Sequence, residues 1–490
     1  MVNDQVLWAG SRAAAANGAA AVGGSGPTRR ALLSGILATG ALGTLSGCAP
    51  ESSRGPASSP TTRGLHPGRS VIVVGAGAAG LAAARRLVDA GVLVQVVEAR
   101  DRIGGRVHTT RKWPDLPVDV GASWIHGEQG NPITAIAQEA RSRTVSTSYD
   151  SSAEIVSPRL AAAGLRSHDS ERWEALLDEA VEGLTSSTDV SIQTAVRREL
   201  EGSGLTPTER ADLAFYLDGA ISTEWGATPD EVSARAHDTG RSFPGADALL
   251  PDGFGAVLAH LSRGIPVRLN SPVRRVRAED GGVVVGIRDE ELRAAAVIIT
   301  IPLGVLKTGQ ILIEPGLSDS ARAAAERLGV GCLSKSFLRF DRVFWPSDVD
   351  WIGYIGERPG HWGQWLSLAK LGAPVLLGFN SGDNGRRIER LTESAVIDEA
   401  HDVLRDMFGS ATPRPRQAQT SSWSTDPWAL GSYSFNSVGS TRADRVNLGA
   451  PISERVFWAG EATEPDYHST VHGAVLSGIR AAEDALRLLG

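Results

Sequence analysis

The stretch "VIVVGAGAAGLAAARRLVDAGVLVQVVE", residues 71–98, decides the fold of this chain. It opens with a β-branched run that predicts a buried strand, and a glycine turn then leads into an alanine-rich helix. Gly91 stops the helix, and a second apolar run ends at Glu98. A strand, a helix and a second strand in this order form a βαβ unit, whose two strands are parallel. We therefore expect an α/β fold built around a parallel sheet.

The glycines of the turn indicate what this unit binds. Gly75, Gly77 and Gly80 have the GxGxxG spacing, in which the first makes the tight turn and the second lets the backbone approach a pyrophosphate. The third lets the helix pack closely on the strand. Glu98 follows at the distance from which an acid accepts hydrogen bonds from a ribose hydroxyl. The pattern predicts a Rossmann-like dinucleotide site, and NAD and FAD share it.

The next segment decides between the two cofactors. "EARDRIGGRVHT", residues 98–109, sets a second glycine turn beside arginines that can neutralise a diphosphate. From here on the sequence resembles the FAD-dependent amine oxidases, which include monoamine, polyamine and spermine oxidases and flavin-dependent histone demethylases. The resemblance recurs in "VDVGASWIHG" (118–127), "VIITIPLGVLK" (297–307), "LGVGCLSKSFLRF" (328–340), "WSTDPWALGSYSF" (423–435) and "VFWAGEATEPDYHSTVHGAVLSGIRAA" (456–482).

The resemblance implies a discontinuous FAD-binding domain with an inserted α+β substrate-binding domain. The FAD-binding domain is expected from residues 68–135, 245–307 and 412–490, and the substrate-binding domain from 136–244 and 308–411. The sequence patterns agree with this division. "LNSPVRRVRAEDGGVVVGI" (269–287) predicts a strand, a turn and a strand, "ERWEALLDEAVEGL" and "ERADLAFYLDGAI" predict helices, and the second inserted part predicts a strand at 333–340 and a helix at 388–408.

The resemblance also assigns residues to the cofactor. From the N-terminal motifs they are Gly75, Gly77, Ala79, Gly80, Glu98, Ala99, Arg100, Gly105, Arg106, Gly121, Ala122, Ser123 and Trp124, and from later motifs Val273, Trp423, Gly460, Glu461, Thr470 and Val471. A helix opening near Val471 presents free N–H groups and a positive dipole end, which the resemblance places at the flavin N1/O2 edge. Glu461 is implied to contact the ribityl-phosphate; the alternative is an acid on a surface loop. Monoamine oxidases carry a cysteine near this position that bonds the flavin. This sequence has Asp466, Tyr467 and His468 there instead, so FAD should be non-covalent.

Lys335 stands out from its surroundings. In a strand from Gly331, alternation puts Lys335 on one face with Phe337, while Leu338 and Phe340 point to the other. Two apolar faces predict an interior strand, and a buried ammonium needs a partner. The resemblance implies that Lys335 is catalytic and approaches the flavin N5 through one bound water. The alternative is a lysine whose head reaches solvent.

The resemblance implies a reaction and a substrate class. The α-carbon of an amine gives hydride to the flavin N5, the imine hydrolyses to an aldehyde, and O2 reoxidises the flavin to yield hydrogen peroxide. "GASWIHG" and "YHSTVHGA" resemble the polyamine and spermine oxidase branch more than the monoamine branch, which has an aromatic residue in place of Thr470. The implied substrate-binding residues are His126 for an amine nitrogen, Glu224 for a distal ammonium, and Trp124, Tyr433 and Thr470, with Trp423 as a further aromatic wall. His126 could instead be a core histidine, and Glu224 a surface helix acid.

Two other functions remain open at this stage. An L-amino-acid oxidase of the same fold needs an arginine fork for the substrate carboxylate, and Arg235 and Arg241 cannot be placed from sequence. A flavoprotein dehydrogenase could pass electrons to a membrane acceptor instead of O2. The net charge of −7 and the absence of a basic run argue against a nucleic-acid partner, and no metal site is predicted.

The N-terminal segment resembles a bacterial export signal. Arg29 and Arg30 precede an apolar run that ends in Leu45-Ser46-Gly47-Cys48, a pattern like a lipobox, and 49–67 form a Ser/Pro/Gly-rich tether. Residues 1–48 are expected to direct export by the twin-arginine route, with lipid on Cys48 and anchoring on the outer side of the cytoplasmic membrane. The alternative is a flexible extension with a chance cysteine. With Cys48 lipidated, Cys332 is the one remaining thiol, so no intrachain disulfide is expected.

Overall fold

The βαβ unit lies at the centre of a parallel sheet. In the computed structural model, which describes residues 68–490, β1 (Ser70–Val74) pairs in parallel with β2 (Leu93–Val97) on one side and β13 (Ala296–Ile299) on the other. The full order is β22-β13-β1-β2-β9, with β22 (Val456–Trp458) and β9 (Val267–Arg268) at the edges and every pair parallel. Segments far apart in sequence thus share one sheet.

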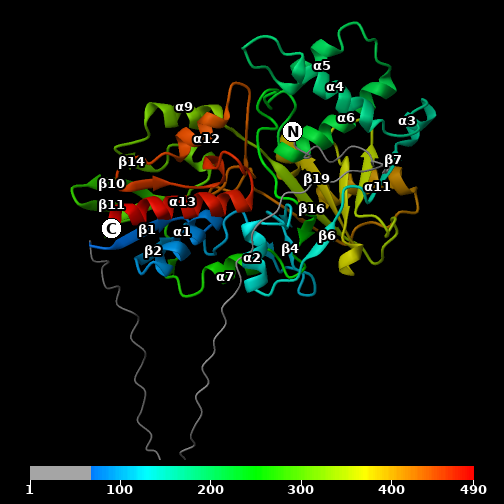
Figure 1. The fold of residues 1–490 in the computed structure, drawn as a ribbon. Helices are drawn as coiled ribbons and strands as arrows, with labels where there is room; N and C mark the ends of the chain where they lie inside the picture. The colour runs from blue at the N-terminus through cyan, green and yellow to red at the C-terminus, as the bar shows by residue number, and fades with distance from the viewer. Residues whose placement is uncertain (1–67) are drawn as a thin grey trace, which may run out of the picture. The chain divides into compact units, whose positions relative to one another are not determined.

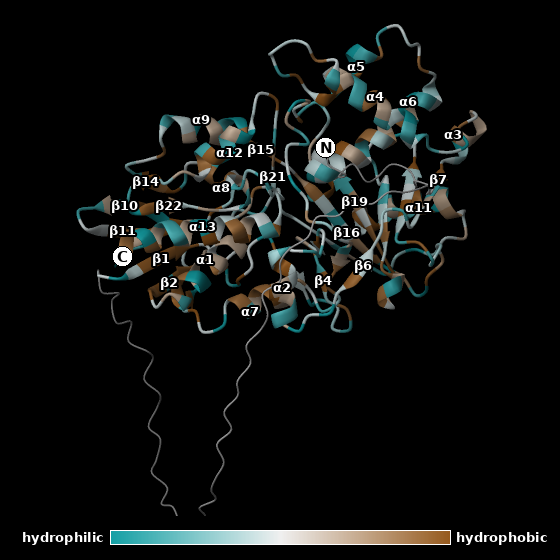
Figure 2. Ribbon diagram, viewed as in Figure 1, coloured by the Kyte–Doolittle hydropathy of each residue, from teal (hydrophilic) through white to brown (hydrophobic). Residues whose placement is uncertain are grey.

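Both faces of this sheet are covered, which explains why β1 is apolar from Val71 to Val74. Val71 and Val73 pack under the helices α1 (Ala78–Asp89) and α13 (Val471–Leu489), which lie side by side in Figure 1. The two helices approach closely because both carry small residues: a Cβ on Gly478 would lie 2.1 Å from the Ala79 carbonyl oxygen. In Figure 2 apolar residues appear brown along β1 and on parts of α1 and α13, which also carry hydrophilic residues.

A second sheet covers the other face. Its order is β12-β11-β10-β14, from β10 (Val273–Glu279), β11 (Gly282–Ile287), β12 (Glu290–Ala294) and β14 (Leu312–Glu314). Val276 and Val285 of this sheet pack against Ile72 and Val74, the alternate side chains of β1. The predicted strand–turn–strand is confirmed. Near the second sheet lie helices α8 (Leu303–Lys307), α9 (Asp319–Arg327) and α12 (Arg442–Gly449). We call the parallel sheet, the second sheet and the helices packed on them the parallel-sheet half.

The other half is built on a six-stranded sheet. Its order is β20-β16-β19-β18-β17-β7, from β20 (Gln417–Thr420), β16 (Leu333–Arg339), β19 (Val375–Ser381), β18 (Gln364–Ser367), β17 (Trp351–Ile355) and β7 (Ser152–Val156). Leu338 and Leu376 pack on one face with α11 (Glu393–Phe408), whereas Phe337 and Phe379 lie on the other. The predicted interior strand around Lys335 is therefore confirmed.

The sheets cross the domain boundaries predicted from sequence. β14 and α9 fall within 308–411, yet β14 pairs with β10 and α9 packs in the parallel-sheet half. β20 falls within 412–490, yet it pairs with β16. The part 136–244 contains β7 besides its predicted helices, and β7 joins the six-stranded sheet. Periodicity predicts that a segment is a strand, but it carries no signal for which sheet the strand joins.

The helix predicted at 388–408 is confirmed as α11 (Glu393–Phe408), but it begins later than predicted. α10 (Gly382–Ile388) ends where the prediction begins, and α11 starts at Glu393 after Thr392, whose hydroxyl accepts a hydrogen bond from the Ala395 N–H at 3.3 Å. The N-cap residue sets this boundary. The predicted helices further upstream are confirmed as α4 (Ser170–Glu182) and α6 (Pro207–Leu217), which continues into a π-helix η1 (Asp218–Thr223).

The remaining elements are short. They are β3 (Thr109–Thr110), β4 (Val118–Asp119), β5 (Trp124–Ile125), β6 (Val145–Thr147), β8 (Asp247–Leu249), β15 (Gly329–Val330), β21 (Ser434–Phe435), α2 (Pro132–Glu139), α3 (Pro158–Ala162), α5 (Ile192–Glu199), α7 (Gly255–Leu261) and the 3-10 turns η2 (Ala369–Leu371) and η3 (Glu461–Thr463). Within residues 68–490, no helix is long and apolar enough to cross a membrane. The predicted export signal, Cys48 and the tether lie outside the described residues.

Candidate active site

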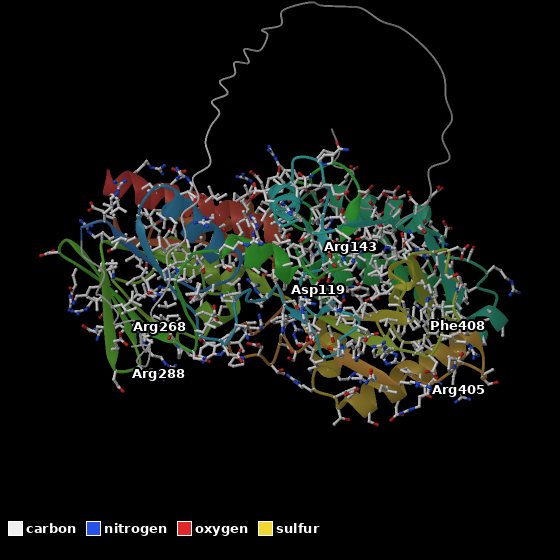
Figure 3. The ribbon with its side chains drawn as sticks, turned by 90° about the horizontal axis from the view of Figure 1, so that it is seen from below. Asp119, Arg143, Arg268, Arg288, Arg405 and Phe408 are labelled. Carbon is white, nitrogen blue, oxygen red and sulfur yellow. The ribbon has the colours of Figure 1, made fainter. Side chains whose placement is uncertain are left out.

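A cavity of about 830 Å³ joins the two halves, within the ~300–1,000 Å³ typical of ligand sites. Its walls include Gly77 after β1, Lys335 on β16 and Val471 at the start of α13. Asp119, on β4, lies between Arg268 of the parallel-sheet half and Arg405 of α11 in the view of Figure 3. A molecule in this cavity would therefore contact both sheets.

The glycine turn forms one end of the cavity. Gly75 has a φ of +106°, which a side chain would strain, and a Cβ on Gly77 would meet nothing closer than the Gly104 carbonyl oxygen at 4.0 Å. Gly80 does not line the cavity: a Cβ there would lie 1.9 Å from the Gly75 carbonyl oxygen, so this glycine serves helix packing and its assignment as a cofactor contact is wrong. Glu98 lines the cavity and is held by the Ala76 N–H at 2.8 Å.

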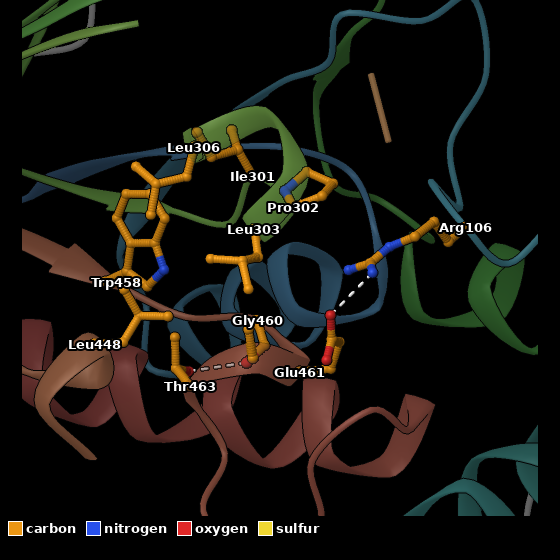
Figure 4. Close-up of a pocket in the computed structure, with 11 residues that line it drawn as sticks. Arg106, Ile301, Pro302, Leu303, Leu306, Leu448, Trp458, Gly460, Glu461 and Thr463 are labelled. Atoms are coloured by element: carbon orange, nitrogen blue, oxygen red, sulfur yellow. Dashed lines mark hydrogen bonds and ion pairs between the residues drawn. The ribbon is translucent and has the colours of Figure 1, made fainter. Parts of the chain in front are cut away.

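The predicted arginines line the cavity but already have acidic partners. Arg100 pairs with Asp426 at 2.5 Å. Arg106 pairs with Glu461 at 2.9 Å, the ion pair drawn in Figure 4. Burial alone would raise the pKa of Glu461, but Arg106 and the Ser434 hydroxyl outweigh it and hold that pKa below its usual value. Glu461 is buried, so the alternative of a surface acid is wrong.

A smaller cavity adjoins this ion pair. It measures about 10 Å³, the space of roughly one water molecule, and Arg106, Leu303, Trp458 and Gly460 are among its lining residues (Figure 4).

Helix α13 begins at the cavity wall. Thr470 is its N-cap, and its hydroxyl accepts a hydrogen bond from the Gly473 N–H at 2.9 Å while Val471 opens the helix, as predicted. Thr470, Val471 and Gly460 all line the cavity. The positive end of a long helix therefore faces the space in which a ligand would lie.

These residues fit a flavin dinucleotide. Every predicted cofactor contact except Gly80 lines this one cavity. The space above Gly77 is open, and a Cβ on Gly460 would meet no atom within 4 Å. Open backbone at Gly77 and Gly460, a ribose-type acid at Glu98 and a helix N-terminus together form a cradle that suits FAD.

Lys335 is buried, with 5% of its surface exposed, so the solvent-reaching alternative is wrong. Its ammonium donates to the Gly121 carbonyl at 2.7 Å and to the Ser123 hydroxyl at 2.8 Å, and it lies 4.8 Å from the Trp124 ring centre. The sequence reading offered only water and flavin as partners and missed these two acceptors. Burial lowers the pKa of Lys335 to about 7, although the charge of Asp119 opposes the shift.

The far end of the cavity carries acids and aromatic rings. Glu224 lines it with an exposed side chain; desolvation by the surrounding protein raises the pKa of Glu224, and nearby His126 partly opposes this. His126 also lines it and pairs with Asp247 at 2.8 Å. Tyr433 lines the same wall, and its hydroxyl donates to the Thr223 carbonyl at 3.1 Å.

The aromatic wall is larger than the sequence predicts. Trp124 stacks on Trp351 with ring centres 5.9 Å apart, and Tyr149 and Phe379 lie 5.0 and 5.7 Å from Trp351. Trp423 lines the cavity too, and its indole donates to the Val120 carbonyl at 2.8 Å.

Sequence reasoning missed several lining residues. They include Tyr149, Arg241, Asp247, Trp351, Phe379 and His472. Asp247 and Trp351 lie outside the recognised motifs, and His472 lies inside one with no role that its spacing would reveal. Of the two unplaced arginines, Arg241 lines the cavity, whereas the Arg235 guanidinium donates to the Leu184 carbonyl at 2.7 Å and is not part of the wall. Residues 68–490 contain no cluster of His, Cys, Asp and Glu that could hold a metal ion.

Comparisons with known proteins agree with this geometry. The model of the family described as flavin-containing amine oxidoreductase matches residues 78–486. Polyamine oxidase 4 of Oryza sativa subsp. japonica is 34% identical over 445 residues, covering 85% of this chain and 88% of that protein. Polyamine oxidase 2 of Arabidopsis thaliana is 33% identical over 437 residues, covering 85% and 87%.

Solved structures agree at the level of the fold. Wild-type putrescine oxidase bound to putrescine superposes with a TM-score of 0.70 at 20% sequence identity, covering 86% of this chain and 99% of that one. At this identity the likeness concerns the shared architecture.

Proposed function

The chain belongs to the family of flavin-containing amine oxidoreductases, and from this membership we propose that it oxidises polyamine-like amines. It is an FAD-dependent amine oxidase. We further propose that the parallel-sheet half binds FAD in the Rossmann manner and that the six-stranded half forms the inserted substrate-binding domain. When bound, FAD supplies the two-electron oxidation of the substrate C–N bond and passes the electrons on to O2.

The observation that carries the substrate class is that an acid and several aromatic rings line the same cavity as Lys335. Glu224 can bind a distal ammonium by a charge-assisted hydrogen bond. The ring faces around Trp351 attract cations and cover the apolar carbon chain between two nitrogens. A flexible chain that carries several ammonium groups satisfies both features.

The protein's own groups have separate roles in this proposal. Lys335, anchored on Gly121 and Ser123, holds a polar group or water beside the reacting centre. The aromatic wall excludes bulk water and keeps the amine close to the cofactor cradle. Glu224 fixes the register of the substrate, and so selects which C–N bond reaches the reacting centre.

An L-amino-acid oxidase is less favoured by the same charges. Glu224 and Asp247 would repel a substrate carboxylate, and Arg241 is a single arginine rather than a fork. The test is anaerobic titration of the oxidised holoenzyme with spermine, N-acetylspermine, putrescine and L-amino acids, followed by admission of O2. We expect a polyamine to bleach the flavin and O2 to restore its colour with release of hydrogen peroxide. Bleaching by L-amino acids alone, or failure of O2 to restore colour while a quinone does, would reject the proposal.

We propose that FAD is held without a covalent bond. Cys332 is the only cysteine of residues 68–490, and it is buried and absent from the cavity wall. Precipitating the holoenzyme with acid should therefore release all the yellow colour into the supernatant. Colour that stays in the protein pellet would show a covalent link.

We also propose that the protein is exported and anchored through Cys48. Support comes from the paired Arg29 and Arg30, the apolar run and the lipobox-like end of that run. The twin-arginine route carries folded proteins, which suits a chain that must acquire its cofactor before export.

A further inference from the structure

The His126–Asp247 pair is set by the backbone register of a small sheet. β5 and β8 pair antiparallel with Trp124 opposite Leu249 and Ile125 opposite Ala248, which brings the next residue of each strand together. One Asp247 oxygen accepts from the Gly127 N–H at 2.9 Å, and the other contacts His126 Nδ1 at 2.8 Å. Asp247 is therefore held in place before it engages the ring.

The other contacts of His126 fix its orientation. The His126 carbonyl accepts a hydrogen bond from the Asn131 side chain at 2.9 Å, and the ring stacks near Trp124 with centres 6.4 Å apart. An ionised carboxylate offers only acceptors, so the proton between Asp247 and His126 lies on Nδ1. In the neutral ring the lone pair is then on Nε2.

His126 Nε2 is free to meet a ligand. No residue in the described range 68–490 hydrogen-bonds this atom, and 48% of the side chain is exposed, although the residue lies in the cavity wall. The exposed surface belongs to the cavity, where a substrate nitrogen would lie.

We propose that Asp247 is a positioning residue that keeps His126 in the tautomer whose Nε2 accepts a proton from the substrate ammonium. The inference deepens the proposed function and rests on it. A protonated amine has no free lone pair and must lose a proton before it can be oxidised. In this step the ammonium N–H bond breaks, the proton moves to His126 Nε2, and the electron pair stays on the amine nitrogen. Asp247 remains ionised and stabilises the imidazolium.

Four charged or titratable groups act on His126. Asp247 on β8 and Glu224 after η1 favour its protonated form, Lys335 on β16 disfavours it, and His472 on α13 lies nearby. Burial lowers the pKa of His126, but the Asp247 hydrogen bond and charge outweigh it, so the net shift is upward. Burial lowers the pKa of His472 to about 3, so this neighbour is neutral at working pH.

The decisive variant is Asp247→Asn, which keeps the shape and removes the charge. The rate of flavin reduction by a polyamine should fall at least tenfold at its plateau, because an asparagine amide can donate to Nδ1 and move the ring proton to Nε2. The acid limb of the pH profile should move down by about one unit or more, since a nearby carboxylate shifts a pKa by ~1–3 units. Asp247→Glu should restore much of both.

A second readout does not depend on turnover. In holoenzyme labelled with 13C at histidine Cε1, NMR titration should show a lower pKa for His126 in Asp247→Asn, with the signal assigned through His126→Gln. The matched control is Glu139→Gln, which removes the carboxylate 3.4 Å from His260 at the surface and should leave the pH profile unchanged.

Two results would overturn the inference. An active wild type whose acid limb and His126 pKa are both unmoved in Asp247→Asn would make Asp247 merely structural. A wild type whose flavin no amine reduces would reject the proposed function and this inference with it.

Discussion

At the scale of single residues, the cavity holds one buried cation whose cost the surrounding protein offsets. Moving an ammonium out of water is unfavourable, but Lys335 gains the Gly121 carbonyl, the Ser123 hydroxyl and the face of Trp124. Its pKa of about 7 means that it can hold or release a proton near neutral pH. A side chain that served packing alone would need none of these contacts, so we expect Lys335 to act on the reaction.

Lys335→Met keeps the side-chain stem and removes the charge. The fold and the flavin content should survive, whereas flavin reduction by amine, reoxidation by O2, or both should slow at least tenfold, equivalent to about 1.4 kcal/mol of barrier. Rapid mixing under anaerobic and aerobic conditions separates the two half-reactions. Wild-type rates in both, in a variant with full FAD content, would mark Lys335 as a bystander.

Glu224 is expected to control selection of the substrate. Glu224→Gln removes the charge that would meet a distal ammonium, so KM for spermine should rise roughly ten- to a hundredfold, the equivalent of ~1.5–3 kcal/mol for a charged hydrogen bond. A simple monoamine of similar size, which lacks the second ammonium, serves as the control substrate, and its KM should stay within about twofold. An equal rise in KM for both substrates would argue that Glu224 shapes the cavity wall but does not bind the distal ammonium.

At the scale of elements, two glycines at the turn between β1 and α1, Gly77 and Gly80, have different structural roles. Gly77 faces open cavity, whereas Gly80 faces the Gly75 carbonyl and the Thr300 hydroxyl. One glycine leaves room for a ligand, and the other lets the helix approach the turn. The GxGxxG pattern predicts these two roles, and the Cβ contacts at the two positions agree with them.

Two alanine variants test this division. Gly77→Ala should fold with an unchanged melting temperature, because its φ of −80° suits alanine and its Cβ meets no protein atom closer than 4.0 Å; the methyl group should nevertheless lower flavin retention. Gly80→Ala should lower flavin retention and should also lower the free energy of unfolding by ~1–3 kcal/mol, because the new Cβ would lie 1.9 Å from the Gly75 carbonyl oxygen. Flavin content after gel filtration and thermal melts followed by circular dichroism report the two effects. A shared loss of stability would contradict the separation.

At the scale of the whole molecule, sequence reasoning succeeds where a local pattern sets the structure. The βαβ unit, the α13 N-terminus and the interior strand of Lys335 follow from periodicity and glycine spacing. Sequence reasoning fails where the structure depends on pairing between strands that are distant in sequence. Pairing of β20 with β16 and of β14 with β10 crosses the predicted boundaries, and Asp247 reaches His126 only because β8 pairs with β5. Such pairings depend on tertiary packing, which one sequence does not encode locally.

The place of the whole molecule in the cell is expected to depend on Cys48. Cys48 lies outside the described residues, and the lipobox-like Leu45-Ser46-Gly47-Cys48 with the tether behind it motivates lipid attachment. Cys48→Ser removes the thiol that would carry the lipid but leaves the tether intact. Each buried methylene of an acyl chain contributes about 0.8 kcal/mol to membrane binding. Loss of the whole lipid should therefore move the protein from the membrane fraction to the soluble fraction.

The matched control for that experiment is Cys332→Ser. This thiol is buried, and burial raises its pKa, so it is a poor site for acylation and its replacement should leave the membrane fraction unchanged. Fractionation with a Triton X-114 phase separation measures both variants, and flavin content confirms that each has folded. If Cys48→Ser remains in the membrane fraction and the detergent phase as the wild type does, another part of the molecule holds it there and the lipid anchor is wrong.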